Sequence, residues 1–257
     1  LEVRDDGGFH VQRLQLGGGG VDVVAQAVDG DVGGGRLEAG GVEGLPEAAV
    51  GLQQGAIGLD MGVAEFGQQL ARGARVALSA RNAARLVEVA AAGGGQALVL
   101  PCDAADEASL RAAWDAVLAE WGGVDVALYV AGDYLPMRAW ELDMAKARRM
   151  IDVNFVAAVS FAACVVPQLL RQGNGQIGFV ASVAGYRGLP KSLIYGPTKA
   201  ALINFAESLY LDLQPRNIGV RVINPGFVAT PLTAQNDFAM PALLTPEQAA
   251  LATIAGL

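Results

Sequence analysis

Two kinds of hydrophobic pattern alternate along the chain from about residue 63 onward. Short, nearly continuous apolar runs predict buried strands, and longer stretches with apolar residues at helical spacing predict helices. The predicted strands are residues 75–79, 97–100, 124–130, 176–181 and 219–223. The predicted helices are residues 63–72, 83–92, 107–121, 142–171 and 195–213, with a last helix that begins at Pro246 and that Thr245 can cap.

The regular alternation of strands and helices predicts βαβ units and a parallel sheet. The predicted strands are apolar on both faces, as strands are when helices cover both sides of a sheet. Right-handed crossovers then give an α/β fold with a doubly wound, Rossmann-like sheet, in which ligands bind beyond the carboxyl ends of the strands. A chain of 257 residues suits one domain of this kind.

The first 50 residues have a different character. They hold 13 of the 34 glycines, including Gly17 to Gly20, and glycine-rich segments lose much entropy on ordering. We therefore predict a leader without a packed core at 1–50 and a dinucleotide-binding and catalytic domain at 51–257. The alternative is that the leader is not native coding sequence. Residues 50–54 make a poor buried strand.

Charge and hydropathy exclude several classes of function. With 18 basic and 26 acidic residues, the formal net charge is −8, which argues against binding to nucleic acid. The sequence has no apolar run of about eighteen residues, so we expect no membrane span. Residues 1–10 lack the features of a signal peptide. These observations predict a cytoplasmic protein.

Cysteine and histidine are too scarce for several common chemistries. Cys102 and Cys164 are the only cysteines, and His10 is the only histidine. A disulfide framework or a metal site is therefore not expected. A Ser-His-Asp triad would need His10, which lies in the leader. Both cysteines are interpreted as core residues.

Tyr195 and Lys199 are the strongest local signal for chemistry. Four residues apart on a predicted helix, they share a face. An ammonium group can stabilise a phenolate, which makes the tyrosine a usable acid or base. Tyrosine and lysine often occur at this spacing by chance on a protein surface. The chain has only three lysines, so chance pairing is less frequent here.

Three further positions surround this pair in the sequence. Ser182 ends a predicted strand, Asn154 lies within a predicted helix, and Pro225-Gly226 with Thr230 follows the next strand. Taken alone, Ser182 could simply form a turn. Asn154 could be exposed, or it could bind water at a local distortion of the helix, because asparagine competes for backbone hydrogen bonds.

In their order and spacing, these residues resemble the short-chain dehydrogenase/reductase family, from about residue 70 to the C-terminus. The resemblance implies that Tyr195 donates or accepts the proton and that Ser182 binds the substrate oxygen. It implies that Lys199 holds the nicotinamide ribose and tunes Tyr195, and that Asn154 anchors a water linked to Lys199. Pro225, Gly226 and Thr230 would seat the nicotinamide ring, and Ala131 and Gly132 would approach the cofactor closely. The hydride chemistry belongs to the cofactor.

Two positions bear on the choice of cofactor. The resemblance puts Asp103 against the adenine, although the same residue could merely cap a turn. Arg81 stands at a strand end where enzymes that use NAD usually carry an acid. A guanidinium suits a 2′-phosphate, so we predict NADP(H), with NAD as the alternative. A solvated arginine at a helix start is the competing interpretation.

The sequence departs from the family pattern at three places. Residues 55–62 stand where a glycine-rich phosphate loop belongs, but Leu59-Asp60-Met61 replace small residues. Tyr129 and Val130 replace a usual Asn-Asn pair before Ala131-Gly132, so the bonds of the asparagine are lost. Finally, the family's last strand would follow residue 257, and without it an edge of the sheet is exposed.

The resulting hypothesis is an oxidoreductase that transfers a hydride between NADP(H) and an apolar carbonyl or alcohol. Tyr134, Leu135, Met137, Tyr186 and residues 227–243 are the expected substrate lining. The alternatives are an inactive binding or regulatory protein on the same scaffold and a fragment without function. A homo-oligomer is a further expectation from the family.

Overall fold

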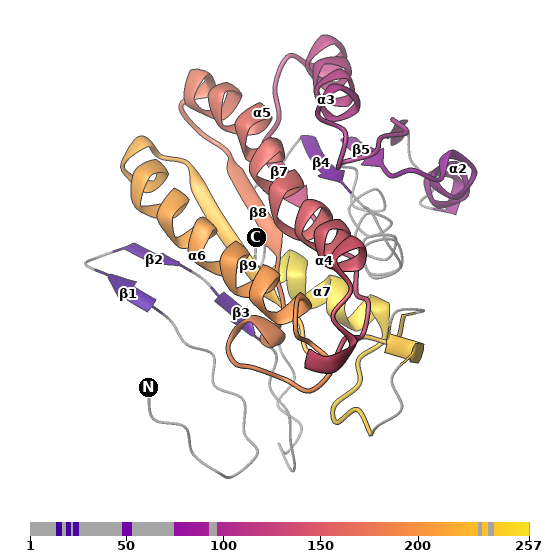
Figure 1. The fold of residues 1–257 in the computed structure, drawn as a ribbon. Coiled ribbons are helices and arrows are strands. Elements are labelled where there is room, and N and C mark those ends of the chain that lie inside the picture. The colour runs from indigo at the N-terminus through magenta and orange to yellow at the C-terminus, as the bar shows by residue number, and fades with distance from the viewer. Residues whose placement is uncertain are drawn as a thin grey trace, which may run out of the picture.

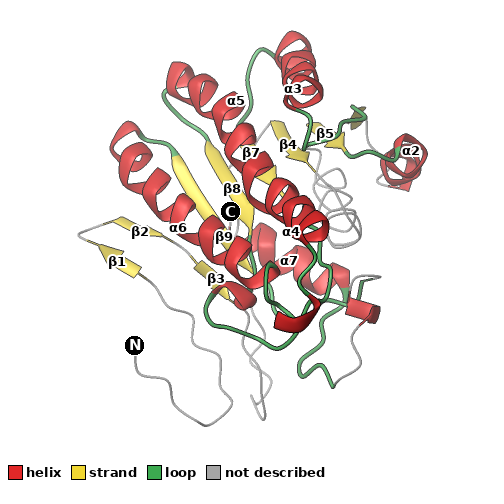
Figure 2. Cartoon of the chain, in the orientation of Figure 1, coloured by secondary structure: helices red, strands yellow, loops and turns green. Residues whose placement is uncertain are grey.

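A computed structural model describes the protein over residues 14–16, 19–21, 23–25, 48–52, 75–92, 97–230, 233–235 and 239–256 (Figure 1). The predicted helix 63–72 and the candidate phosphate loop 55–62 lie outside these residues. The described part is a layered α/β structure with a central sheet (Figure 2). This confirms the predicted fold class.

The sheet has seven strands in the order β3-β9-β8-β7-β4-β5-β6, and every neighbouring pair is parallel. The strands are β3 (Val23–Ala25), β4 (Ala48–Leu52), β5 (Arg75–Ser79), β6 (Ala97–Val99), β7 (Val126–Tyr129), β8 (Gln176–Val180) and β9 (Gly219–Asn224). A separate antiparallel pair consists of β1 (Leu14–Leu16) and β2 (Gly19–Val21). From β4 the chain adds β5 and β6 on one side of the sheet and then β7, β8 and β9 on the other. In doubly wound sheets, ligands bind at this switch point, here between β4 and β7.

Helices cover both faces of the sheet. The helices are α2 (Ala83–Ala92), α3 (Glu107–Trp121), α4 (Met144–Ile151), α5 (Ala157–Gln172), α6 (Tyr195–Leu213) and α7 (Pro246–Gly256). One large apolar cluster joins α3, α5 and α6 to one face, through residues such as Trp114, Phe161 and Leu202. Smaller clusters pack α2 and α7 on the other face. Successive residues of β7 point to opposite clusters, as a doubly covered sheet requires.

Two findings revise the expectations for the edges and centre of the sheet. The segment 50–54, a poor buried strand by its sequence, overlaps β4 (Ala48–Leu52), which pairs with β5 on one side and β7 on the other. Pairing on both sides outweighs the poor strand propensity of this segment. Beyond β9, where an open edge was expected, β3 (Val23–Ala25) is paired in parallel. The sequence pattern had not predicted this strand.

The long helix expected over residues 142–171 is broken into three pieces. α4 begins after Asp143, whose carboxylate accepts hydrogen bonds from the backbone N–H of Ala145 and Lys146. A π-helical turn, Asp152–Val156, separates α4 from α5. We call this segment the π-turn. Its i→i+5 hydrogen bonding makes the helix locally wider than an α-helix.

The caps at the last helix follow the sequence prediction. The Thr245 hydroxyl accepts a hydrogen bond from the Gln248 N–H at 3.2 Å, and the Gln248 side chain accepts one from the Thr245 N–H at 2.9 Å. This reciprocal pair is a capping box. It fixes the start of α7, as predicted for Thr245.

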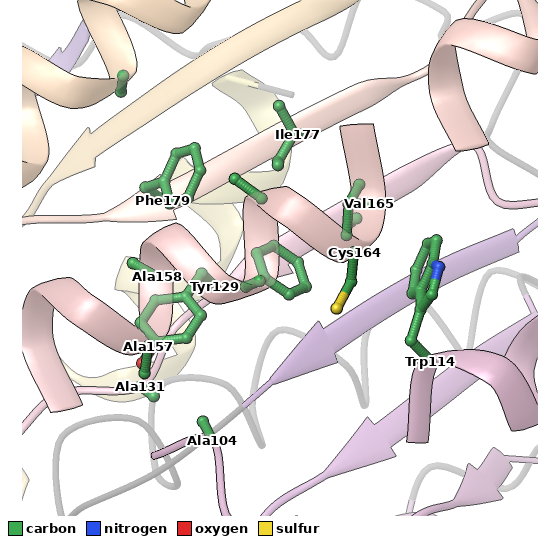
Figure 3. Close-up of a cluster of buried hydrophobic side chains, with 14 of the residues drawn as sticks. Ala104, Trp114, Tyr129, Ala131, Ala157, Ala158, Cys164, Val165, Ile177 and Phe179 are labelled. Carbon is green, nitrogen blue, oxygen red and sulfur yellow. The ribbon is translucent and has the colours of Figure 1, made fainter. Parts of the chain in front are cut away.

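One helical stretch, Met144–Gln172, is long and apolar enough to cross a membrane by length and composition alone. Half of its most apolar segment is buried inside the protein. The buried side includes Phe161, Val165 and Leu169, which belong to the large cluster on the sheet. Figure 3 shows Val165 with the aromatic side chains of that cluster. These contacts are those of a core helix.

Candidate active site

The site is built at the carboxyl ends of β7 and β8 and the first turns of α6. Ser182 follows β8 and caps the short 3-10 turn Val183–Gly185, because its hydroxyl accepts a hydrogen bond from the Ala184 N–H at 3.1 Å. The Ser182 side chain also hydrogen-bonds the Tyr195 hydroxyl. The Ser182 side chain therefore both caps the turn and contacts Tyr195.

Tyr195 and Lys199 lie one turn apart on α6, and both are buried. The Lys199 Nζ lies 5.7 Å from the centre of the Tyr195 ring. It donates a hydrogen bond to the Val180 carbonyl at 2.8 Å. That carbonyl is its only acceptor among the described residues, so two of its three N–H groups remain for a ligand.

Burial is the largest cause of the pKa shifts of Tyr195 and Lys199. Burial raises the pKa of Tyr195 to about 12, the Ser182 hydrogen bond opposes this shift, and Tyr134 adds to it. Burial lowers the pKa of Lys199 to about 7, because the charged ammonium loses its hydration. Near neutral pH the lysine can thus gain or lose its proton, while the tyrosine is a neutral hydrogen-bond donor.

Asn154 sits in the middle of the π-turn and is fully buried. Its carboxamide oxygen accepts a hydrogen bond from the Asp133 N–H at 2.7 Å, and its Nδ2 donates to the Asp133 carbonyl at 2.9 Å. The same Nδ2 donates to the Thr198 hydroxyl at 3.1 Å. The local helix distortion considered from the sequence is therefore present, and the exposed alternative for Asn154 is wrong.

Ala131 and Gly132 run between β7 and the π-turn. A Cβ atom added to Gly132 would stand 3.4 Å from the Lys199 Nζ and 3.7 Å from the Asn154 carboxamide oxygen. A glycine therefore lets the backbone approach the lysine closely. Ala131 is fully buried in the large apolar cluster that joins α3, α5 and α6 to the sheet.

Pro225, Gly226 and Thr230 follow β9 at the same edge of the sheet. The Pro225 carbonyl accepts a hydrogen bond from the Val183 N–H at 3.2 Å, which joins this segment to the Ser182 turn. A side chain at Gly226 would meet open space. The buried Thr230 hydroxyl has no hydrogen-bond partner among the described residues. A buried hydroxyl without a partner among the described residues fits a polar ligand group.

Arg81 and Asp103 lie at neighbouring strand ends on the other side of the switch point. The Cys102 N–H donates to the Ala80 carbonyl at 3.0 Å, which brings the two segments together. Arg81 is exposed, and Asp103 is half-buried. The Asp103 carboxylate accepts a hydrogen bond from the Ala105 N–H at 3.0 Å, so it does cap a turn.

The structure adds site residues that the sequence did not reveal in these roles. Thr198 links Asn154 to the Tyr195 carbonyl, to which its hydroxyl donates at 2.7 Å. Tyr134 packs edge-on against Tyr195, with ring centres 5.1 Å apart. Asp133 forms a 2.6 Å ion pair with Arg149 of α4. Only the spacing of Thr198, three residues after Tyr195, could have suggested one of these contacts.

Comparisons with known proteins point in one direction. The family model described as short chain dehydrogenase matches residues 54–240. An uncharacterized oxidoreductase of Myxococcus xanthus is 38% identical over 131 residues, which cover 51% of this chain and 52% of the relative. The chain thus spans about half the length of that relative. Carbonyl reductase family member 4 of Xenopus tropicalis is 31% identical over 162 residues, 62% of this chain and 67% of that protein.

The fold is also similar to a solved enzyme. The L-sorbose reductase of Gluconobacter frateurii, in complex with NADPH and L-sorbose, has a TM-score of 0.73 and 26% identity. The similarity covers 82% of this chain and 89% of the reductase.

Proposed function

The chain belongs to the short-chain dehydrogenase family, and from this premise we propose that it transfers a hydride between NADP(H) and an apolar carbonyl or alcohol. The arrangement that carries the proposal is the buried set of Ser182, Tyr195 and Lys199 beside the π-turn. Acid–base chemistry at an oxygen needs a proton donor held next to a second donor, and Tyr195 with Ser182 provides both.

Tyr195 is the proposed general acid in reduction and the general base in oxidation. The Ser182 hydroxyl, already bonded to the tyrosine, would share the substrate oxygen with it. Lys199 would stabilise the phenolate when Tyr195 gives up its proton, because an ammonium near the ring favours the charged form. Asn154, fixed by three hydrogen bonds, would hold a water that connects Lys199 to solvent.

The residues present fit a nicotinamide dinucleotide. At one edge of the sheet, Lys199 offers N–H groups and Thr230 a hydroxyl that have no partner in the described part of the chain, and the backbone at Gly132 lies close to the lysine. Lys199 would hold the ribose, and Pro225, Gly226 and Thr230 the nicotinamide. Asp103 would contact the adenine. When bound, the cofactor would supply or accept the hydride.

Preference for NADP(H) is proposed from Arg81. The residue is exposed beyond β5, at a strand end where an acid would favour the 2′-hydroxyl of NAD. A guanidinium there can bind a 2′-phosphate through charge-assisted hydrogen bonds.

An apolar substrate is proposed from the surroundings of Tyr195. The tyrosine is packed with Met137, Met150 and Ala184, and Tyr134 and Leu135 adjoin this group. Among the expected lining, Met137 is fully buried and therefore supports the wall behind the site instead of contacting a substrate. Tyr186 is half exposed and is available for contact.

The test is a titration of the purified chain with NADPH and, separately, NADH, followed by nicotinamide fluorescence. We expect saturable binding of NADPH, much tighter than that of NADH. A screen of apolar ketones and aldehydes follows, with Tyr195→Phe as the control. The variant should bind NADPH but lose about 10²- to 10⁴-fold in kcat, the usual contribution of a general acid. Absence of binding to either nucleotide would overturn the proposal.

A further inference from the structure

Tyr129, at the end of β7, contacts the π-turn directly. Its side chain is fully buried, and its hydroxyl donates a hydrogen bond to the Val153 carbonyl at 2.6 Å. Its ring packs against Phe161 of α5, with centres 5.6 Å apart. Figure 3 shows Tyr129 within this buried cluster, together with Ala157 and Ala158 at the start of α5.

The same short stretch of chain meets the π-turn at a second point. Four residues after Tyr129, the backbone N–H and carbonyl of Asp133 bond to the Asn154 side chain. Residues 153 and 154 are therefore held from both ends of the segment 129–133. Gly132, which lies within that segment, is the backbone that approaches Lys199.

We propose that Tyr129 is a positioning residue that holds the π-turn, and through it Asn154 and Gly132, in register with Lys199. This inference rests on the proposed function, because Asn154, Gly132 and Lys199 are parts of that site. The proposal also gives Tyr129 a role at a position where the family pattern has an asparagine. A tyrosine reaches from β7 to the helix and replaces the lost side-chain bond with one to a backbone carbonyl.

The chemistry of the contact suits a fixed support. Burial raises the pKa of the Tyr129 hydroxyl, so it stays a neutral donor over the pH range of an enzyme. A phenol has few rotatable bonds, and its packing against Phe161 fixes the direction of the hydroxyl. If the hydroxyl is removed, the Val153 carbonyl loses this donor in a site without access to solvent.

The experiment compares Tyr129→Phe with Tyr210→Phe. Tyr210 is also a buried tyrosine, but it lies near the far end of α6, fifteen residues from Tyr195 in sequence. Hydrogen exchange of the backbone amides of residues 150–158 is measured first, without any ligand. NADPH binding and steady-state kinetics follow, so that kcat is separated from cofactor affinity.

For Tyr129→Phe we expect faster exchange in 150–158 and a loss of about 10- to 100-fold in kcat, since small displacements of catalytic groups have effects of this size. The NADPH affinity should fall by less than kcat does, because the proposed Arg81 contact lies two strands away, beyond β5, and does not depend on the π-turn. Tyr210→Phe should match the wild type in all three measurements.

Equal exchange and equal kcat in the two variants would overturn the role of Tyr129. If the wild type reduces no carbonyl compound, the proposed function fails, but the exchange data remain decisive for the positioning role. Faster exchange only in Tyr129→Phe would then still support the hold on the π-turn, and unchanged exchange would refute it.

Discussion

The two ends of the site differ in how their polar groups are held. At the reacting end, Asn154 and Lys199 are buried, and each is fixed by hydrogen bonds to carbonyls or side chains of other segments. At the nucleotide end, Arg81 is exposed, and Asp103 is half-buried in a turn. The first end is organised by the fold itself, and the second relies on charges that water screens.

This difference predicts how mutations should behave. A buried polar group that loses its partner costs much more free energy than an exposed one, because water cannot replace the bond. Changes at the reacting end should therefore affect catalysis and stability together. Changes at the nucleotide end should affect only which nucleotide binds.

Among the substitutions that test this difference between the two ends, Asn154→Ala should have the largest effect. The substitution removes three hydrogen bonds and leaves the backbone N–H and carbonyl of Asp133 without their partner. We expect the free energy of unfolding to fall by about 2–4 kcal/mol and kcat to fall about 100-fold. Denaturant unfolding and steady-state kinetics measure the two losses.

Asn204→Ala, at an exposed position of α6, is the matched control and should change neither quantity. If Asn154→Ala were as stable and as active as Asn204→Ala, the π-turn network would have no part in organising the reacting end.

A smaller effect is expected from Lys199→Met on the pH dependence of stability. The folded pKa of Lys199 is about 7, below its ordinary value of 10.5, so the unfolded chain binds more protons between these pH values. The wild-type free energy of unfolding should therefore rise with pH above 7, by up to about 1.4 kcal/mol per pH unit. The cost of burying the charge is fully present below pH 7.

Urea unfolding at pH 7, 8 and 9 measures this slope, in a window below the titration of Tyr195. Lys199→Met should lose the slope, and Lys146→Met should keep it, because Lys146 is exposed beside Asp143. The same slope in all three proteins would show that Lys199 keeps its charge in the folded state.

The smallest effect should come from Arg81→Ser. Loss of one charge-assisted contact to a 2′-phosphate should weaken NADPH binding about tenfold and leave NADH binding and stability nearly unchanged. Arg216→Ser removes an exposed arginine outside the site and serves as the control for net charge. Equal losses of NADPH and NADH affinity would remove the basis for the NADP preference.

Much of the fold could be predicted because local signals coincide with tertiary ones. The helices at 83–92, 107–121 and 195–213 have the predicted bounds. In the second of these, Asp106 caps the start and Gly122, in the left-handed conformation, ends it. The residues that form such caps are adjacent in sequence to the helix that they begin or end, so they can be recognised without the structure.

The parts that could not be predicted depend on distant segments. Nothing near Tyr129 in sequence indicates that its hydroxyl will meet the Val153 carbonyl, 24 residues away. The ring contact of Tyr134 with Tyr195 and the pairing of β3 with β9 likewise join segments far apart in the chain. Periodicity and propensity describe residues that are close along the chain, so they do not predict contacts between distant segments.

In the π-turn the Ala157 N–H bonds to the carbonyl of Asp152, five residues back, which is one residue more than in an α-helix. Deletion of a single residue from 152–156 would let α4 and α5 merge into one regular helix. Such a shortened chain would gain regular backbone bonds but would rotate Asn154 away from Asp133 and Thr198. Regular helix geometry and the placement of Asn154 are therefore incompatible at this segment.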